Sequence, residues 1–129
     1  MAAAESTVIY TDHVARLTPV RTVAFDDWRA AIALHGELDV ANADDLRAEL
    51  VAHLDAGRRV LRVDASGVDF IDSTAVGVLV AIDQRCRQEH GSLILTGVRR
   101  PLARLLAIAG LDQVLLVDTA GLREVADAR

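Results

Sequence analysis

Apolar and polar positions alternate over two neighbouring stretches in the first third of the chain. In residues 20–25 and again in residues 28–34, apolar side chains recur at roughly every second position, a period typical of strands with one buried face. Asp26 and Asp27 separate the two stretches, and acidic residues of this kind favour a turn. The pattern therefore predicts an antiparallel hairpin.

After this hairpin, helix-like and strand-like stretches alternate to the end of the chain. Short apolar runs bounded by turn residues predict buried strands, and longer runs with apolar side chains three or four positions apart predict helices. The predicted strands are residues 60–63, 93–95 and 114–117, and the predicted helices begin after Asn42, at Asp72 or Ser73, at Pro101 and after Thr119. This order is typical of right-handed crossovers. We expect an α/β domain with a mixed, mostly parallel sheet of about four or five strands and about four helices.

Residues that are common at helix ends support the predicted starts and ends of these helices. Asn42 is a good N-cap for the first predicted helix, and Gly57 stands where that helix would stop. Pro101 fits the first turn of the third predicted helix, because a proline lacks an N–H that would be unpaired there in any case. Gly91 and Gly110 mark the ends of the second and third helices.

The most polar start of any predicted helix is the run Asp72-Ser73-Thr74, which follows the strand at residues 60–63 and a short loop. Two hydroxyls there lie beside backbone N–H groups that have no partner within the helix. The simplest interpretation is that Asp72 or Ser73 caps the helix. Gly77 follows one turn later, where alanine would suit a helix better, and a glycine permits the close approach of another backbone or a partner.

Composition narrows the class of protein. The chain has 129 residues, which suits one domain, and 52% of them are hydrophobic but only 3% aromatic, so the core must be aliphatic. A net charge of −5 argues against binding nucleic acid or an anionic membrane through bulk charge. We expect no signal peptide, no membrane-spanning helix and a cytoplasmic location, to which the single Cys86 is suited.

The sequence offers no pattern for a catalytic, cofactor or metal site. His13, His35, His53 and His90 are scattered without ligand spacing, and we expect them at the surface or in loops. The chain contains no lysine, which excludes a phosphate-binding glycine loop of the lysine type, and it has no nucleophile-elbow pattern. We therefore expect no catalytic residues, no cofactor and no metal.

Three short motifs, in this order and spacing, resemble the STAS domain. They are the Gly-Glu-Leu-Asp run at residues 36–39, residues 68–74 followed by Gly77, and the Leu-Asp pair at residues 111–112 before the last predicted strand. More narrowly, the chain resembles the free-standing anti-sigma factor antagonists of bacteria. The resemblance covers about residue 20 onward, so it implies a STAS-like domain over residues 20–129 and an extension, which we expect to be mobile, over residues 1–19.

The resemblance implies a phosphorylation-controlled regulator of transcription and no enzyme. In that family, the serine directly after the loop aspartate is phosphorylated by a kinase that is itself the anti-sigma factor. The unphosphorylated antagonist binds this kinase and frees the sigma factor, and a PP2C-type phosphatase resets the switch. Carried over to this chain, the phosphorylation site is Ser73, with Thr74 as the lesser candidate, and the acidic neighbours are Asp72 and Asp39.

The apolar helix after Ser73 supplies the predicted partner surface. A helix that lies on one face of a sheet cannot bury every side chain, so part of this helix should be exposed near Ser73. The predicted partner-binding residues are Asp39, Asp72, Thr74, Ala75, Val76, Gly77 and Val80.

Ala75 departs from the family pattern, which usually has glycine two residues after the phosphoserine. We expect its methyl group beside the acceptor hydroxyl, where it would slow phosphorylation or select a different kinase. Two other functions stay open. One is a STAS subunit of a non-sigma complex, such as a stress-signalling assembly or a lipid-transport complex. The other is a small serine hydrolase that uses Ser73 and a histidine.

Overall fold

A computed structural model describes residues 19–117 of the chain. Its elements, in order, are β1 (Val20–Phe25), β2 (Arg29–Leu38), α3 (Ala43–Asp55), β3 (Val60–Ile71), α4 (Ser73–Gln88), β4 (Ser92–Thr96), α5 (Arg100–Ala109), the 3-10 helix η1 (Leu111–Gln113) and β5 (Leu116–Val117). The expected mixed α/β fold is confirmed. The predicted helix after Thr119 and all but the last residue of the predicted extension lie outside the described residues.

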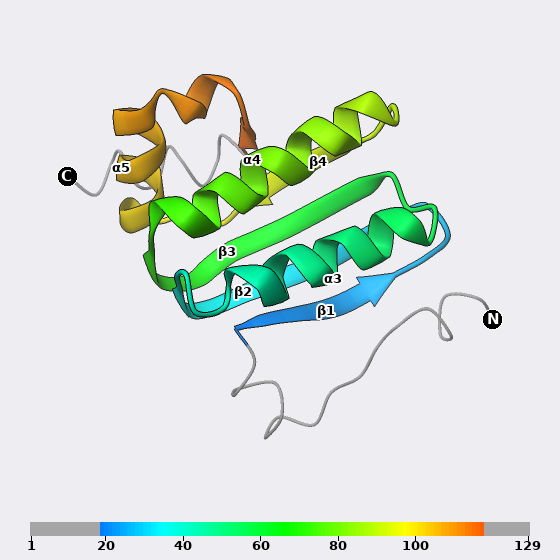
Figure 1. The fold of residues 1–129 in the computed structure, drawn as a ribbon, viewed down its shortest axis with the longest axis horizontal. Coiled ribbons are helices and arrows are strands. Elements are labelled where there is room, and N and C mark those ends of the chain that lie inside the picture. Colours follow the sequence, from blue (N-terminus) through cyan, green and yellow to red (C-terminus); the bar gives the residue numbers. More distant parts are fainter. Residues whose placement is uncertain (1–18, 118–129) are drawn as a thin grey trace.

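The five strands form one sheet in the order β1-β2-β3-β4-β5, in which β1 and β2 are antiparallel and every other neighbouring pair is parallel. The predicted hairpin is confirmed, and its turn is held by Asp26, whose Oδ1 accepts hydrogen bonds from the backbone N–H groups of Trp28 and Arg29 at 2.8 and 2.7 Å. Because the parallel strands are added in one direction, right-handed crossovers place successive helices on the same face. Figure 1 shows α3 and α4 side by side over that face.

The core lies between these two helices and the sheet. Alternate residues of each strand point toward the helices, and every third or fourth residue of each helix points back. The fully buried aliphatic side chains include Ile32 and Leu34 of β2, Leu61 and Val63 of β3, Leu93 and Leu95 of β4, Leu46 and Leu50 of α3, and Leu79 of α4. Burial of this kind contributes about 1.5–3 kcal/mol for each large aliphatic side chain. No helix within residues 19–117 is long and apolar enough to cross a membrane.

Strand β3 is much longer than the four residues expected, because the predicted loop after residue 63 continues as strand to Ile71. The polar residues that suggested a loop lie on the exposed face of the sheet: Asp64 and Ser66 are exposed, whereas Ala65 between them is buried. Strand β2 likewise continues to Leu38, which pairs with Ile71 of β3. At the far edge, β5 has two residues where four were expected.

The observed helix ends agree in part with those predicted from the sequence. Pro101 is in the first turn of α5, and Gly110 ends that helix with φ 73°, as expected. Helix α4 stops before Gly91, and it is His90 that takes a positive φ of 64°. Gly91 has a different role, because a Cβ at that position would lie 1.9 Å from the carbonyl oxygen of Arg59. Asn42 precedes α3 without capping it through its side chain.

Candidate functional site

The candidate site lies at the edge of the sheet where β2 and β3 end. These strands are parallel, and Leu38 pairs with Ile71, so the residues that follow them, Asp39 and Asp72, begin neighbouring loops. The backbone N–H of Asp72 donates to the carbonyl oxygen of Leu38 at 3.0 Å, which continues the pairing up to the residue before α4. Two of the three sequence motifs therefore meet at one place.

Asp72 is the N-cap of α4. Its backbone is extended, with φ −106° and ψ 177°, and its Oδ1 accepts a hydrogen bond from the N–H of Ala75 at 3.0 Å. The other carboxylate oxygen, Oδ2, accepts from the N–H of Val40 in the β2–α3 loop at 3.2 Å. One carboxylate thus caps the helix and also fastens the neighbouring loop to it. Of the two predicted caps, Asp72 is correct and Ser73 is wrong.

Ser73 and Thr74 are the first two residues of α4, and both are exposed. Among residues 19–117, neither hydroxyl takes part in a hydrogen bond, because the capping bond belongs to Asp72. The Ser73 hydroxyl is therefore open to a reagent that approaches from solvent, at a point fixed by the strand and helix on either side.

The carboxylate of Asp39 accepts its hydrogen bond within the β2–α3 loop. Its Oδ1 accepts from the N–H of Ala41 at 2.9 Å, and its backbone N–H donates to Oδ1 of Asn42 at 3.0 Å. Asn42 in turn donates from Nδ2 to the carbonyl oxygen of Glu37 at 2.8 Å. Asn42 therefore braces the loop, which explains why its side chain does not cap α3. The structure brings Asp39 to the same sheet edge as Ser73, and within the described part of the chain the two form no hydrogen bond.

Two predicted partner-binding residues on α4 are buried. The side chain of Ala75 is 0% exposed and that of Val76 is 3% exposed, because both lie on the face of the helix that packs against the sheet. They cannot form part of a partner surface in this conformation. The outward face of α4 carries Ser73, the exposed Gly77 and the half-buried Val80. A Cβ at Gly77 would meet nothing within 4 Å, so the space above this turn is open.

The burial of Ala75 also corrects the expectation that its methyl group crowds the Ser73 hydroxyl. The methyl points into the core, while Ser73 points to solvent. The alanine therefore adds packing to the first turn of α4 and leaves the hydroxyl accessible.

Two exposed apolar residues near Ser73 were not predicted from the sequence. Val40, whose N–H is bound by Asp72, is 73% exposed, and Phe70, two residues before Asp72, is 49% exposed. Val40 lies in a loop, where no hydrophobic period exists to identify it. A large apolar residue inside a predicted polar turn was the available signal.

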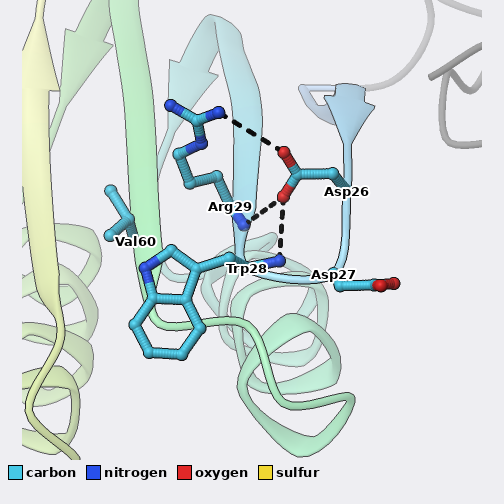
Figure 2. Close-up of a pocket in the computed structure, with 5 residues that line it drawn as sticks. All are labelled: Asp26, Asp27, Trp28, Arg29 and Val60. Carbon is cyan, nitrogen blue, oxygen red and sulfur yellow. Dashed lines mark hydrogen bonds and ion pairs between the residues drawn. The ribbon is translucent and has the colours of Figure 1, made fainter. Parts of the chain in front are cut away.

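A hollow of about 560 Å³ lies at the other end of the sheet, where β2 and β3 begin. It is lined by Asp26, Asp27, Trp28, Arg29 and Val60, and Figure 2 shows the indole of Trp28 lying beside Val60 while Arg29 reaches back to Asp26. Hydrogen bonds from the backbone N–H groups of Arg29 and Trp28 lower the pKa of the Asp26 carboxyl below its ordinary value. Because Ser73 follows the opposite end of β3, this hollow does not serve the Ser73 hydroxyl.

The sequence of this domain matches a known protein family. Residues 22–126 match the sequence model of a family described as "Mlab, STAS domain". The chain belongs to the STAS domain family. The resemblance read from the three motifs is thereby confirmed, and this STAS domain covers most of the chain.

Named relatives of this STAS domain are antagonists of anti-sigma factors. It is 34% identical over 84 residues to the anti-sigma-B factor antagonist of Bacillus subtilis, covering 65% of this chain and 76% of that protein. It is 33% identical over 84 residues to the anti-sigma-B factor antagonist of Listeria monocytogenes, covering 65% and 74%.

Among solved structures, the Bacillus cell fate determinant SpoIIAA in its phosphorylated form superposes with a TM-score of 0.63 at 18% identity, covering 85% of this chain and 99% of that one. At this level of identity, the superposition shows a shared fold.

Proposed function

We propose that this STAS domain is an anti-sigma factor antagonist controlled by phosphorylation at Ser73. In its unphosphorylated form it binds an anti-sigma factor that is also a serine kinase, and the sigma factor is released. The observation that carries the proposal is the exposed Ser73 hydroxyl at the start of α4, free of hydrogen bonds among the described residues because Asp72 supplies the cap. The relatives named as anti-sigma-B factor antagonists support it.

Electrostatics explains how a phosphate on Ser73 blocks binding. A phosphate adds about −1.5 to −2 charge at pH 7, next to the carboxylate of Asp72. The positive end of α4 tolerates this charge in the free protein. A partner that presses an apolar surface against Val40, Gly77 and Val80 would bury the phosphate without a counter-charge, which is costly.

The surface around Ser73 determines the chemistry of the partner. Val40 is exposed, Gly77 leaves open space, and Val80 is half-buried. A partly apolar contact of this kind favours a partner that docks on α4 and the β2–α3 loop together. Thr74 is exposed at the rim of the same surface, and Asp39 and Asp72 act by holding the loop and the helix start in place.

The proposal includes a cytoplasmic location and, as the family resemblance implies, a PP2C-type phosphatase that removes the phosphate from Ser73. The protein itself would act by binding and without catalysis. A serine hydrolase needs a base within hydrogen-bond reach of its nucleophile. Among residues 19–117, no histidine forms a hydrogen bond with Ser73.

The test is phosphorylation by the cognate anti-sigma factor with ATP, followed by mass spectrometry. We expect one phosphate, on Ser73, in the wild type and in Thr74→Ala, and none in Ser73→Ala. Thr74→Ala is the matched control, because both hydroxyls are exposed in the same helical turn. A phosphate found on Thr74 or Ser66, or undiminished incorporation in Ser73→Ala, would refute the assignment.

The second candidate is a STAS subunit of a non-sigma complex, such as a stress-signalling assembly or a lipid-transport complex. It is favoured by the match to the family described as "Mlab, STAS domain", because that description names no sigma-factor pathway. Affinity capture with the wild type and with Ser73→Glu separates the candidates. The leading proposal expects a kinase that is retained by the wild type and lost by Ser73→Glu.

A further inference from the structure

A partly buried polar cluster joins α3 to the β1–β2 hairpin, at the end of the sheet away from Ser73. His53 of α3 is 6% exposed, although its sequence context suggested a surface position. Its Nε2 lies 2.8 Å from Oγ1 of Thr22 on β1, and its Nδ1 lies 3.3 Å from Nη1 of Arg58 in the α3–β3 loop. Thr22 also donates a hydrogen bond to Glu49, one turn before His53.

The donors and acceptors in this cluster assign the proton on the ring. Thr22 has one hydroxyl hydrogen, and it goes to the Glu49 carboxylate, so Thr22 can only accept from His53. Nε2 of His53 therefore carries a hydrogen. A guanidinium only donates, so Arg58 donates to Nδ1, which must be unprotonated. The hydrogen bonds fit a neutral imidazole.

A second proton on His53 would conflict with its surroundings. It would sit on Nδ1, facing the donor group of Arg58, and would place a second positive charge beside the half-buried guanidinium. The His53 ring faces two residues of β1, Thr22 and Phe25, and the centres of the His53 and Phe25 rings are 6.0 Å apart. Glu49, at 4.0 Å, is the one carboxylate that the described residues place in contact with the ring. Burial chiefly, and then Arg58, lower the pKa of His53, while Glu49 opposes them.

Arg58 connects His53 to the turn of the hairpin. Its Nε donates to the carbonyl oxygen of Asp26 at 2.8 Å, and its guanidinium carbon lies 4.1 Å above the centre of the Phe25 ring. A displacement of Arg58 would therefore remove one of the contacts that hold the β1–β2 turn. The turn backbone is also held by Asp26 and by the N–H groups of Arg59 and Val60, which donate to the carbonyl oxygen of Trp28.

We propose that Thr22, Glu49, His53 and Arg58 form a proton-sensitive latch, which holds α3 to the β1–β2 hairpin while His53 is neutral and opens when the imidazole is protonated. The latch goes beyond the proposed function, because none of its four residues lies at the Ser73 site.

The direction of the pH effect follows from linkage. A histidine in an unfolded chain has a pKa of about 6.5, and the pKa of His53 is lower in the folded protein. The latch's contribution to stability is fully present above pH ~6.5. It is lost progressively as the pH falls from there toward the folded pKa, by at most about tenfold in the folding constant per pH unit. The carboxyl groups of Asp26 and Glu89 also have lowered pKa values, but they make stability depend on pH only below pH ~4.5.

The first test is nuclear magnetic resonance of the ring nitrogens in the full-length protein. We expect the Nε2–H tautomer at pH 7.5 and a pKa for His53 below 6.5. Protection of backbone amides from hydrogen exchange, compared at pH 7.5 and 5.5, should fall in the turn at Trp28 and Arg29 and hold in β4. A His53 pKa of 6.5 or higher, or an equal loss of protection in β4, would overturn the latch.

The second test is urea unfolding at pH 6.5 and 5.5 for the wild type, His53→Gln and the exposed-site control His35→Gln. The folding constant of the wild type and of His35→Gln should drop by up to about tenfold between pH 6.5 and 5.5, whereas that of His53→Gln should change much less. An unchanged pH dependence in His53→Gln would overturn the proposal. If His53→Gln does not fold, the ring titration of the wild type still decides.

Discussion

Replacing Asp72 with alanine tests whether one carboxylate holds two segments together. The change removes the acceptor for the N–H of Ala75, which caps α4, and the acceptor for the N–H of Val40 in the β2–α3 loop. Loss of an N-cap costs about 0.5–2 kcal/mol. Loss of a hydrogen bond to a charged group costs up to about 1.5–3 kcal/mol, and the bond to Val40 counts for less because it is exposed to solvent.

We therefore expect Asp72→Ala to lower the free energy of unfolding by about 1.5–3 kcal/mol. For a domain of this size, that corresponds to a fall in melting temperature of roughly 6–15 °C. Urea unfolding followed by circular dichroism measures the first quantity, and a thermal scan measures the second. Asp72→Asn keeps one cap oxygen and should lose only about half as much, because asparagine caps helices almost as well as aspartate.

Asp69→Ala is the control for a general loss of negative charge at this edge. Asp69 is exposed, and its one ion pair among the described residues joins it to Arg99 at 3.8 Å, so the change should cost less than about 0.5 kcal/mol. Hydrogen exchange at the amide of Val40 gives a local readout, with faster exchange expected in Asp72→Ala. If Asp72→Ala were as stable as Asp69→Ala, or if Val40 exchanged at the wild-type rate, the two-segment role of Asp72 would be refuted.

Three further changes on α4 have distinct expected outcomes. Val76→Asp should unfold the protein, seen as lost circular dichroism, because it buries an unpaired charge at a side chain that is 3% exposed; a folded variant would contradict this. Ala75→Gly should lower the free energy of unfolding in urea by about 1–2 kcal/mol, because it loses helix propensity and a buried methyl group. The rate of phosphorylation in a kinase assay should not change. Faster phosphorylation would support the hypothesis that the Ala75 methyl crowds the Ser73 hydroxyl. Gly77→Ala should raise stability by up to about 1 kcal/mol yet weaken partner affinity in calorimetry; unchanged affinity would place the contact elsewhere.

The fold could be predicted because its signals are local. Hydrophobic period, proline and glycine positions and the alternation of elements all act within a few residues, and the hairpin, α3, α4 and α5 followed from them. The second half of β3 did not, because Asp64 and Ser66 lie on the exposed face of a sheet. A half-buried strand rich in polar residues has the same local composition as a loop.

At the candidate site, the sequence identified the polar run but could not assign roles within it. Whether Asp72 or Ser73 caps the helix depends on one backbone geometry at the end of β3, which no pattern specifies. The rotation of α4 about its axis decided that Ala75 and Val76 are buried and Gly77 is exposed. Residues 75–82 of this helix are all apolar, so the hydrophobic period of that segment does not fix the rotation. The His53 cluster could not be predicted, because Thr22, which binds Nε2 of His53, lies 31 residues away in the chain.

The division of tasks between Asp72 and Ser73 has a consequence for how such a domain can change over generations. Because the cap is supplied by the aspartate, the side chain at position 73 is not needed for the helix to begin. If Ser73 is the phosphorylation site proposed above, mutations at that position can remove the acceptor hydroxyl or imitate its phosphate while the domain still folds. A lineage could therefore alter its response to signalling one substitution at a time, with every intermediate protein remaining folded and available for selection.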